Sequence, residues 1–292
     1  MAKFRFRLIL LVFVVVSTVT YLFYATGNES NVVPQDIPSA QSNTNKKNSE
    51  LGSISRIIHQ TYRTASVEQW ALESGRDNRT SWFLSWELKN NGYKHSVLDD
   101  AAADAFMKSN FDSRTYEAYK RMPLPVLRAD LLRYAMIYIH GGVYTDSDTE
   151  CHKAVDSWAG RYSKETEFLA SIEWYKDSHN FDIPMYKKTQ LVQWTFAAAP
   201  RHPIFKNTIA DIVQKVEKLS LKHLGDKNNV EALGGPQVFT RHVLEYMAGN
   251  GDDLEQLGQK DDTSDRIYFE KSRVLLLPMF SFMAQLAVSF VL

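Results

Sequence analysis

A chain of 292 residues is long enough for one domain with a sizeable hydrophobic core and a short appendage. Its 34 basic and 34 acidic residues balance, which argues against a nucleic-acid partner held by net positive charge. Cys151 is the only cysteine, so an intrachain disulfide and a cysteine-based zinc site are excluded. Cys151 could be a nucleophile, but a free cysteine is more commonly a small buried residue, here expected just after a strand.

The N-terminal residues have the pattern of a membrane anchor. Lys3, Arg5 and Arg7 lie in a short tail, residues 1–7, and an uncharged apolar run follows over residues 8–25. Such a run can cross a bilayer as a helix, and the basic residues before it are typical of a cytoplasmic tail. A cleaved signal peptide is the alternative, but this run is longer than the usual apolar part of one. We therefore expect an uncleaved anchor and a single-pass type II membrane protein.

Residues 26–53 differ in composition from the segments on either side. They are rich in Asn, Ser, Gln and Thr and poor in apolar residues, so they cannot bury a core and predict a flexible lumenal stem. Glycosylation sequons begin at Asn28 and Asn78, and both would face the lumen in this topology. The globular domain is then expected over residues 54–292.

This domain alternates between strand-like and helix-like segments. Strands are expected at residues 54–60, 93–98, 143–145, 168–172 and 195–199, and helices at residues 101–108, 124–140, 204–219 and 237–248. Pro125 suits the first turn of the second helix, and Gly141 and Gly142 end it, since glycine can turn the chain without a Cβ clash. The alternation predicts an α/β domain.

The segment 127–150, LRADLLRYAMIYIHGGVYTDSDTE, carries the candidate chemistry. Asp130 and Arg133 are three residues apart and share a helix face, although the same spacing also suits a plain surface ion pair. Asp146 and Asp148 stand at the end of the short strand that follows. Carboxylates suit hard cations such as Mn²⁺ or Mg²⁺, which can neutralise a departing diphosphate. A lone Asp-x-Asp is a weak signal, and the ordered block strengthens it.

The block RADLLRYAMIYIHGGVYTDSDT resembles the signature of glycosyltransferase family 32, the DXD sugar-binding enzymes. IIHQTYRT at residues 57–64 is similar to the opening strand of the family, with Tyr62 where the family often has Trp. Further segments that match in family order are YKHSVLDD (93–100), YEAYKRMPLPV (116–126), SIEW (171–174), QWTFAAAPRHP (193–203) and GGPQVFT (234–240). The resemblance covers about residues 54–280, and it points to the fungal initiating α-1,6-mannosyltransferases.

This resemblance implies a GT-A fold, a Rossmann-like mixed sheet with flanking helices that binds a nucleotide sugar. It implies Mn²⁺ (or Mg²⁺) as the cofactor, GDP-mannose as the donor, retention of the α configuration and N-linked glycans of glycoproteins as acceptors. It also implies a lumenal domain anchored in the Golgi membrane by the N-terminal helix, and membership of a Golgi mannosyltransferase complex.

Site residues follow from the resemblance by position. Asp146 and Asp148 would hold the metal, and together with Asp130 and Arg133 they form the expected catalytic set. The implied substrate-binding residues are Gln60, Thr61, Arg128, Asp130, Arg133, Gly142, Tyr144, Asp146 and Glu173. For Glu173, an exposed residue at a strand end is an equally good interpretation.

The C-terminal segment and the acceptor leave alternatives open. Residues 274–292 carry no charge and are long enough to span a membrane, whereas the resemblance makes VLLLP a buried strand. No histidine follows His242, although the resemblance implies one that completes the metal site, so we expect a truncated or unrelated C-terminal end. An inositol phosphorylceramide mannosyltransferase, an inactive Golgi protein with the same fold, and a soluble hydrolase with paired carboxylates are the alternative functions.

Overall fold

The computed structural model describes residues 52–66, 69, 79–175, 189–255, 257, 266–278 and 281–282. The chain divides into two units, Met1–Asn45 and Lys46–Leu292, and all described residues belong to the second. The expected tail, anchor, most of the stem and both sequon asparagines, Asn28 and Asn78, lie outside the described residues. Within the described ranges, no helix is both long and apolar enough to cross a membrane.

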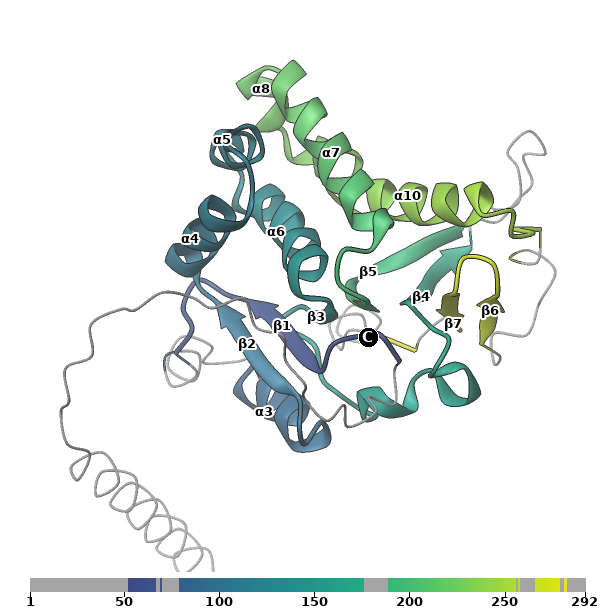
Figure 1. Ribbon diagram of the computed structural model, residues 1–292. Coiled ribbons are helices and arrows are strands. Elements are labelled where there is room, and N and C mark those ends of the chain that lie inside the picture. The colour runs from purple at the N-terminus through teal and green to yellow at the C-terminus, as the bar shows by residue number, and fades with distance from the viewer. Residues whose placement is uncertain are drawn as a thin grey trace, which may run out of the picture. The chain divides into compact units, whose positions relative to one another are not determined.

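A seven-stranded sheet forms the centre of the described domain, in the order β2-β1-β3-β5-β4-β7-β6 (Figure 1). Its strands are β1 (Ile57–Thr61), β2 (Lys94–Leu98), β3 (Gly142–Thr145), β4 (Phe168–Tyr175), β5 (Thr189–Ala198), β6 (Ile267–Phe269) and β7 (Val274–Leu277). β1 is parallel to β2 and β3, β5 is antiparallel to β3 and β4, and β7 is parallel to β4 and antiparallel to β6. The carboxyl ends of β1, β2, β3, β4 and β7 therefore share one edge of the sheet.

Helices cover both faces of this sheet. They are α3 (Arg79–Lys89), α4 (Asp100–Asn110), α5 (Ser113–Arg121), α6 (Pro125–His140), α7 (Pro203–Lys218), α8 (Leu221–Leu224), α9 (Val230–Leu233) and α10 (Pro236–Gly249). A proline in the first turn starts α6, α7 and α10, where its fixed φ suits a helix and its missing N–H is not needed. The Asp99 and Asp112 carboxylates cap α4 and α5 by accepting backbone N–H bonds.

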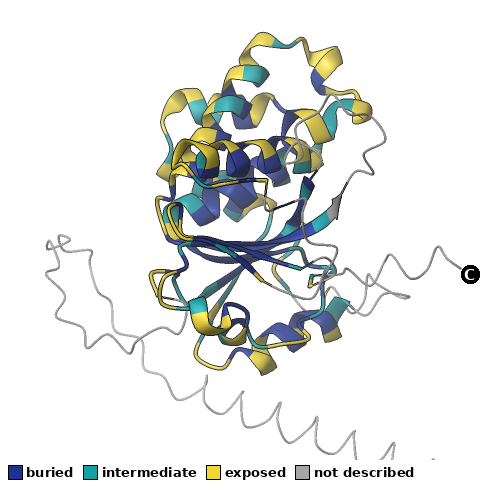
Figure 2. Ribbon diagram, turned by 90° about the vertical axis from the view of Figure 1, so that its right-hand side faces the viewer, coloured by how far each residue is buried: buried dark blue, intermediate teal, exposed yellow. Residues whose placement is uncertain are grey.

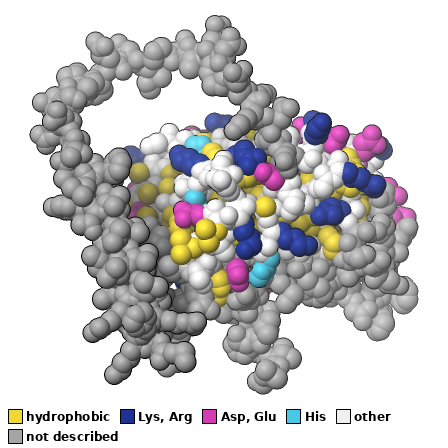
Figure 3. Space-filling view, turned by 90° about the horizontal axis from the view of Figure 1, so that it is seen from below, with side chains coloured by type: hydrophobic (Ala, Val, Ile, Leu, Met, Phe, Trp, Pro, Cys, Tyr) yellow, Lys and Arg dark blue, Asp and Glu magenta, His cyan; other side chains and the backbone are white. Residues whose placement is uncertain are grey.

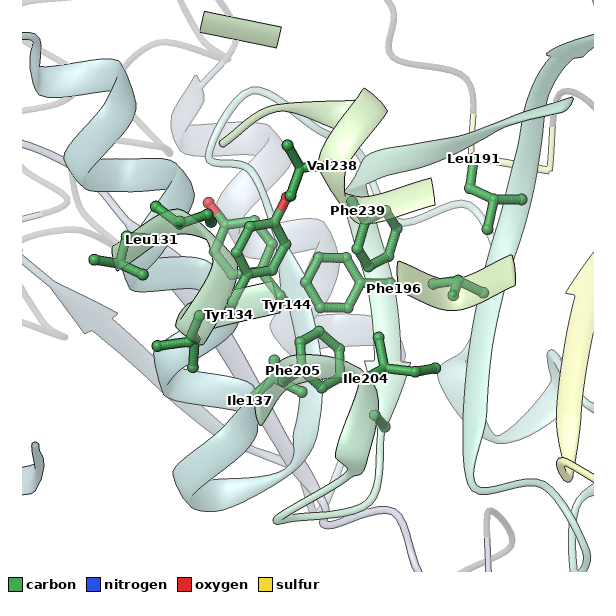
Figure 4. Packing of buried hydrophobic residues seen from close by; sticks show 14 of the residues in the cluster. Leu131, Tyr134, Ile137, Tyr144, Leu191, Phe196, Ile204, Phe205, Val238 and Phe239 are labelled. Carbon is green, nitrogen blue, oxygen red and sulfur yellow. The ribbon is translucent and has the colours of Figure 1, made fainter. Parts of the chain in front are cut away.

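Two hydrophobic clusters lie on opposite faces of the sheet. Figure 2 shows the sheet edge-on between its helical layers. The larger cluster lies under α6, α7 and α10 and contains the packed rings of Tyr134, Phe196, Phe205 and Phe239 (Figure 4). The smaller one lies on the α3 side and includes Trp86, Trp158 and Cys151. Cys151 is buried in this cluster, which confirms the interpretation of a small packed residue.

The expected mixed α/β architecture is confirmed, with element boundaries displaced by a few residues. The largest difference is β5, which begins at Thr189 instead of residue 195. The helices α3, α5, α8 and α9 and the strand β6 were not expected. The buried strand that the resemblance implied for VLLLP is present as β7, whose residues are all buried, so residues 274–277 do not begin a membrane span. On the face shown in Figure 3, Lys and Arg side chains are scattered among acidic, apolar and other residues.

Candidate active site

The strand order predicts where a ligand would bind. From β1 the chain passes through α3 on one face to β2, and from β2 it passes through α4, α5 and α6 on the other face to β3. Since β2 and β3 flank β1 on opposite sides, the crossover direction reverses between β1 and β3. Ligands of open α/β sheets bind outside the carboxyl ends of the strands at such a reversal. Thr61 and Asp146 stand at these two ends.

The turn after β3 is held on both sides by its backbone. The Asp146 N–H donates to the carbonyl of Trp194 on β5 at 2.8 Å. The Asp146 carbonyl accepts bonds from Thr149 Oγ1 at 2.7 Å and from Gln60 Nε2 at 3.3 Å. Inside the turn, the hydroxyl of Thr145 also bonds to that of Thr149 at 2.6 Å. The two aspartates therefore project from a fixed turn, not from a loose loop.

Asp130 and Arg133 are buried on the inner face of α6, with 3 % and 7 % of their surface exposed. The Arg133 Nη2 atom lies 3.3 Å from Asp130 Oδ1 and 3.4 Å from Asp146 Oδ1. Nη1 donates to the carbonyl of Gln193 at 3.2 Å, and the guanidinium lies over the ring of Tyr144. The interpretation of a surface ion pair is therefore wrong, because the ridge of α6 that carries both residues faces the sheet.

Burial raises the pKa values of the two inner carboxyl groups. The pKa of Asp130 rises to about 6 because burial disfavours its charged form, an effect that Arg133 opposes and Asp146 reinforces. The pKa of Asp146 is also raised by burial, while Arg133 and a 2.6 Å hydrogen bond from the Tyr144 hydroxyl stabilise its carboxylate. One guanidinium thus faces two carboxylates, and Asp148 adds a third. Fully ionised, the cluster has an excess of two negative charges, which a divalent cation would balance.

Asp148 differs from Asp146 in its surroundings. Both residues are partly exposed, but Asp146 accepts a hydrogen bond from Tyr144 and pairs with Arg133, whereas no residue in the described ranges donates a hydrogen bond to the Asp148 carboxylate. The described residues also contain no group of three or more His, Cys, Asp or Glu side chains arranged to hold a metal. Mg²⁺-type sites commonly combine one or two carboxylates with substrate phosphates. The carboxylates of Asp146 and Asp148 fit a site in which substrate phosphates would complete the coordination of the cation. Asp148 is the less constrained of the two carboxylates.

The other implied substrate-binding residues lie in different settings. Thr61 and Arg128 line a cavity of about 390 Å³, together with Tyr62, Leu98 and Leu132, between the ends of β1 and β2 and the start of α6. Glu173 on β4 is partly buried, which raises its pKa, and it accepts a 2.8 Å bond from Gln190. Glu173 is therefore partly exposed, as the surface interpretation expects, but its carboxylate is held by Gln190.

Gly142 and Gln60 occupy positions with little room for a ligand. Gly142 has a φ of +97°, and a Cβ atom there would lie 2.4 Å from the carbonyl oxygen of Ile57. It allows β3 to pair closely with β1. Gln60 is fully buried, and both ends of its amide are bonded within the protein. Its effect on the site passes through the Asp146 carbonyl.

Gln193 on β5 belongs to the site and was not expected there. Its Nε2 atom donates to Asp130 Oδ1 and to the carbonyl of Gly234, each at 3.1 Å. Gly234 lies so close that a Cβ atom would be 3.2 Å from the Asp130 Cβ. Gln193 and Arg133 therefore both contact Oδ1 of the buried carboxylate and fix its orientation. Only the QWTF and GGPQ segments of the sequence hinted at these residues, and neither indicates a contact with Asp130.

Comparison with known proteins finds a family match over the part of the chain that carries Asp130, Arg133, Asp146 and Asp148. Residues 77–165 match the model of the glycosyltransferase sugar-binding region containing the DXD motif. Among solved structures, the PaToxG glycosyltransferase superposes with a TM-score of 0.46 and 16 % identity over 70 % of this chain and 74 % of that one, a likeness too distant to carry an argument.

Curated relatives share part of the chain. The initiation-specific alpha-1,6-mannosyltransferase of Schizosaccharomyces pombe is 34 % identical over 56 % of this chain and 43 % of its own length, and that of Candida albicans is 32 % identical over 56 % and 46 %. The inositol phosphoceramide mannosyltransferase 1 of Schizosaccharomyces pombe is 26 % identical over 68 % of this chain and 54 % of its own. The chain spans about half the length of the curated relatives it matches.

Proposed function

We propose that the chain is a metal-dependent mannosyltransferase of the GT-A type, since residues 77–165 match the model of the glycosyltransferase sugar-binding region that contains the DXD motif. Its donor is GDP-mannose, and its reaction transfers mannose with retention of the α configuration. The acceptor is an N-linked glycan of a glycoprotein, extended through an α-1,6 linkage. Mn²⁺, or Mg²⁺ in its place, is the cofactor.

The observation that carries this proposal is the position of Arg133 between Asp130 and Asp146, with the partly exposed Asp148 in the same turn as Asp146. Asp148, assisted by Asp146, would hold the cation, and a cation there supplies charge neutralisation for a leaving diphosphate. A nucleotide sugar brings both a diphosphate for the cation and hydroxyl groups for buried carboxylates. The cluster matches these two demands within one site.

The residues of the chain have separable tasks in this proposal. Arg133 stabilises negative charge that develops on the diphosphate, since a preorganised donor in a buried site acts more strongly than one in water. Its Nε atom is buried and has no hydrogen-bond partner among the described residues. Asp130, held by Gln193, accepts hydrogen bonds from sugar hydroxyls and fixes the orientation of the sugar. Thr61 and Arg128 line the neighbouring cavity, which we assign to the nucleoside.

A second acceptor has independent support. Relatives named inositol phosphoceramide mannosyltransferase 1 and mannosyl phosphorylinositol ceramide synthase SUR1, the latter from Saccharomyces cerevisiae, match this chain as well. The alternative function is therefore mannose transfer to inositol phosphorylceramide. For either acceptor, we place the enzyme in the Golgi membrane as a type II protein anchored by residues 8–25, with its catalytic domain in the lumen and in a complex with other mannosyltransferases.

The test is a transfer assay with the full chain. GDP-mannose is compared with UDP-galactose as the donor, and an N-glycan is compared with inositol phosphorylceramide as the acceptor, each with and without Mn²⁺. We expect Mn²⁺-dependent transfer from GDP-mannose to the N-glycan, abolished in Asp148→Asn. Asp112→Asn is the matched control, because asparagine caps a helix about as well as aspartate. Transfer only to the ceramide would select the alternative, and transfer by Asp148→Asn at the original rate would overturn the proposed site.

A further inference from the structure

A buried hydrogen-bond chain connects three strands to the turn that carries both aspartates. Gln60 on β1 lies between His95 on β2 and Asp146 after β3, and none of its surface is exposed. Its Oε1 atom is 3.0 Å from His95 Nε2, and its Nε2 atom is 3.3 Å from the Asp146 carbonyl oxygen. Parallel pairing of β1 with β2 sets Gln60 opposite Val97, which brings His95 within reach of its amide.

The direction of these bonds is determined by chemistry. A carbonyl oxygen can only accept, so the amide nitrogen of Gln60 must face Asp146 and its oxygen must face His95. His95 must then carry its proton on Nε2. His95 therefore donates its Nε2 proton to Gln60 Oε1, and Gln60 Nε2 donates a proton to the Asp146 carbonyl.

The surroundings of His95 keep it neutral and fixed. Its ring stacks on Phe83 with centroids 4.3 Å apart, and burial lowers its pKa to about 4. The other ring nitrogen, Nδ1, has no hydrogen-bond partner within the described ranges, and the Glu87 carboxylate lies 3.8 Å from it. In the described part of the chain, the hydrogen-bond partner of His95 Nε2 is the Oε1 atom of Gln60.

Among the described residues, Gln60 is the only one outside the turn whose side chain donates to the Asp146 carbonyl. Thr149 binds the same carbonyl from within the turn and moves with it. The Asp146 N–H is tied to β5 through Trp194. Gln60 supplies the corresponding tie to β1, on the side of the crevice where Thr61 ends its strand. Helix α3 also holds the turn, because Arg79 Nη1 donates to Ser147 Oγ at 3.2 Å and Trp86 Nε1 donates to the Thr149 carbonyl at 3.1 Å. Without Gln60, the turn would keep its ties to α3 and β5 but lose its side-chain tie to β1.

We propose that Gln60 and His95 are positioning residues that preorganise the Asp146–Asp148 turn for the metal and its nucleotide. They touch neither ligand and act through the Asp146 carbonyl. This inference rests on the proposed function for its ligand. Groups that orient metal ligands from behind commonly change metal affinity by about 10- to 100-fold when they are removed.

The test compares three variants of the full chain with a matched control. Gln60→Met removes the hydrogen bonds to His95 and to the Asp146 carbonyl while keeping a side chain of similar volume. His95→Phe removes the donor and keeps a ring against Phe83, whereas His95→Gln restores an N–H donor. His59→Phe is the control, because His59 is equally buried on β1 but its Nε2 bonds to the Gly141 carbonyl at 3.0 Å instead. The dissociation constant of Mn²⁺ in the presence of GDP is measured for each, with amide hydrogen exchange over residues 145–150.

We expect Gln60→Met to weaken Mn²⁺ binding about tenfold and to speed exchange in the turn. His95→Phe should have a smaller effect of the same kind, His95→Gln should restore near-original binding, and the double variant should be no worse than Gln60→Met alone. Equal effects in His59→Phe, or effects of Gln60→Met and His95→Phe that simply multiply, would overturn the proposal. If the unaltered chain binds no Mn²⁺–GDP, the proposed function fails, and the exchange data alone decide whether Gln60 and His95 hold the turn.

Discussion

Arg133 on α6 contacts Asp146 at the end of β3, with Nη2 3.4 Å from Oδ1. The two residues are joined by the end of α6, two glycines and β3, so the helix and the strand return to each other at the site. The guanidinium is nearly enclosed, and a buried charge is stable only when it is paired and hydrogen-bonded. This relationship connects the stability of the domain to the chemistry of the site.

Arg133→Lys should be far from conservative. The guanidinium divides its two terminal nitrogens among Gln193, Asp130 and Asp146, whereas a lysine ammonium cannot span these acceptors from one position. We expect kcat for mannose transfer to fall at least about 100-fold, as when a donor to developing negative charge is lost, and the free energy of unfolding to fall by about 3 kcal/mol.

The control for this change is Arg114→Lys, in an exposed pair with Glu217. Exposed ion pairs contribute little to stability because solvent screens them, so we expect kcat and the free energy of unfolding to hardly change in Arg114→Lys. Steady-state kinetics and urea unfolding measure the two effects. An Arg133→Lys enzyme with near-original kcat would show that the guanidinium geometry is irrelevant to turnover.

Asp130→Asn should stabilise the ligand-free protein while it removes activity. The native pKa of Asp130 is about 6, above its ordinary value of 3.8, so ionisation destabilises the folded state as pH rises through this window. At neutral pH the neutral asparagine should therefore raise the free energy of unfolding by up to about 3 kcal/mol. Urea unfolding at several pH values measures this, and a less stable Asp130→Asn protein at neutral pH would contradict it.

Three buried histidines should make the fold sensitive to acid. Burial lowers the pKa of His59, His95 and His202 from 6.5 to about 4. Between these values the unfolded chain binds more protons than the native one, so stability is complete above pH 6.5 and falls as pH decreases toward about 4. Each histidine accounts for about 3 kcal/mol over the whole window.

Replacing one of these histidines measures its own contribution to the pH dependence of the free energy of unfolding. His59→Phe should reduce the proton uptake on unfolding near pH 5 by about one proton, which is a slope smaller by about 1.4 kcal/mol per pH unit. Urea unfolding from pH 4.5 to 7.5 gives this slope. An unchanged slope would mean that His59 does not remain neutral in the folded protein.

Gly142→Ala should disrupt the pairing of β1 with β3. The added Cβ would lie 2.4 Å from the Ile57 carbonyl oxygen, in addition to the strain of a φ of +97°. Gly92 is a matched control, since its φ is +89° but its nearest neighbour is the movable end of the Arg56 side chain at 3.8 Å. We expect Gly92→Ala to cost about 1–2 kcal/mol, the usual range for backbone strain, and Gly142→Ala clearly more. Equal losses of unfolding free energy would show that the close contact is relieved without effect.

Local patterns predicted the elements that build the site. Pro125 and Gly141 marked the ends of α6 correctly, and the strand that ends at Thr145, just before Asp146, was found from its neighbours. Helix α3 was missed because its buried residues, Trp82, Phe83, Ser85 and Trp86, form a short cluster without a clear apolar stripe.

Contacts between distant segments could not be predicted in the same way. The spacing of Asp130 and Arg133 gives a shared helix face but not whether that face meets the sheet, which depends on how α6 packs. Gln193 is 63 residues from Asp130 in the chain, and their contact depends on how far β5 extends past β3. The bond between His95 and Gln60 depends on the register of β1 and β2.

In the proposed function, Asp148 binds a divalent cation that it shares with a nucleotide diphosphate. Isothermal titration of Mn²⁺ into the full chain, with and without GDP, tests it most directly when Asp148→Asn and Asp112→Asn are measured in parallel. We predict Mn²⁺ binding that GDP strengthens, unchanged in Asp112→Asn and weakened at least about tenfold in Asp148→Asn, the loss expected for a direct ligand. Equal Mn²⁺ affinity in the unaltered and Asp148→Asn proteins, with GDP present, would contradict the account.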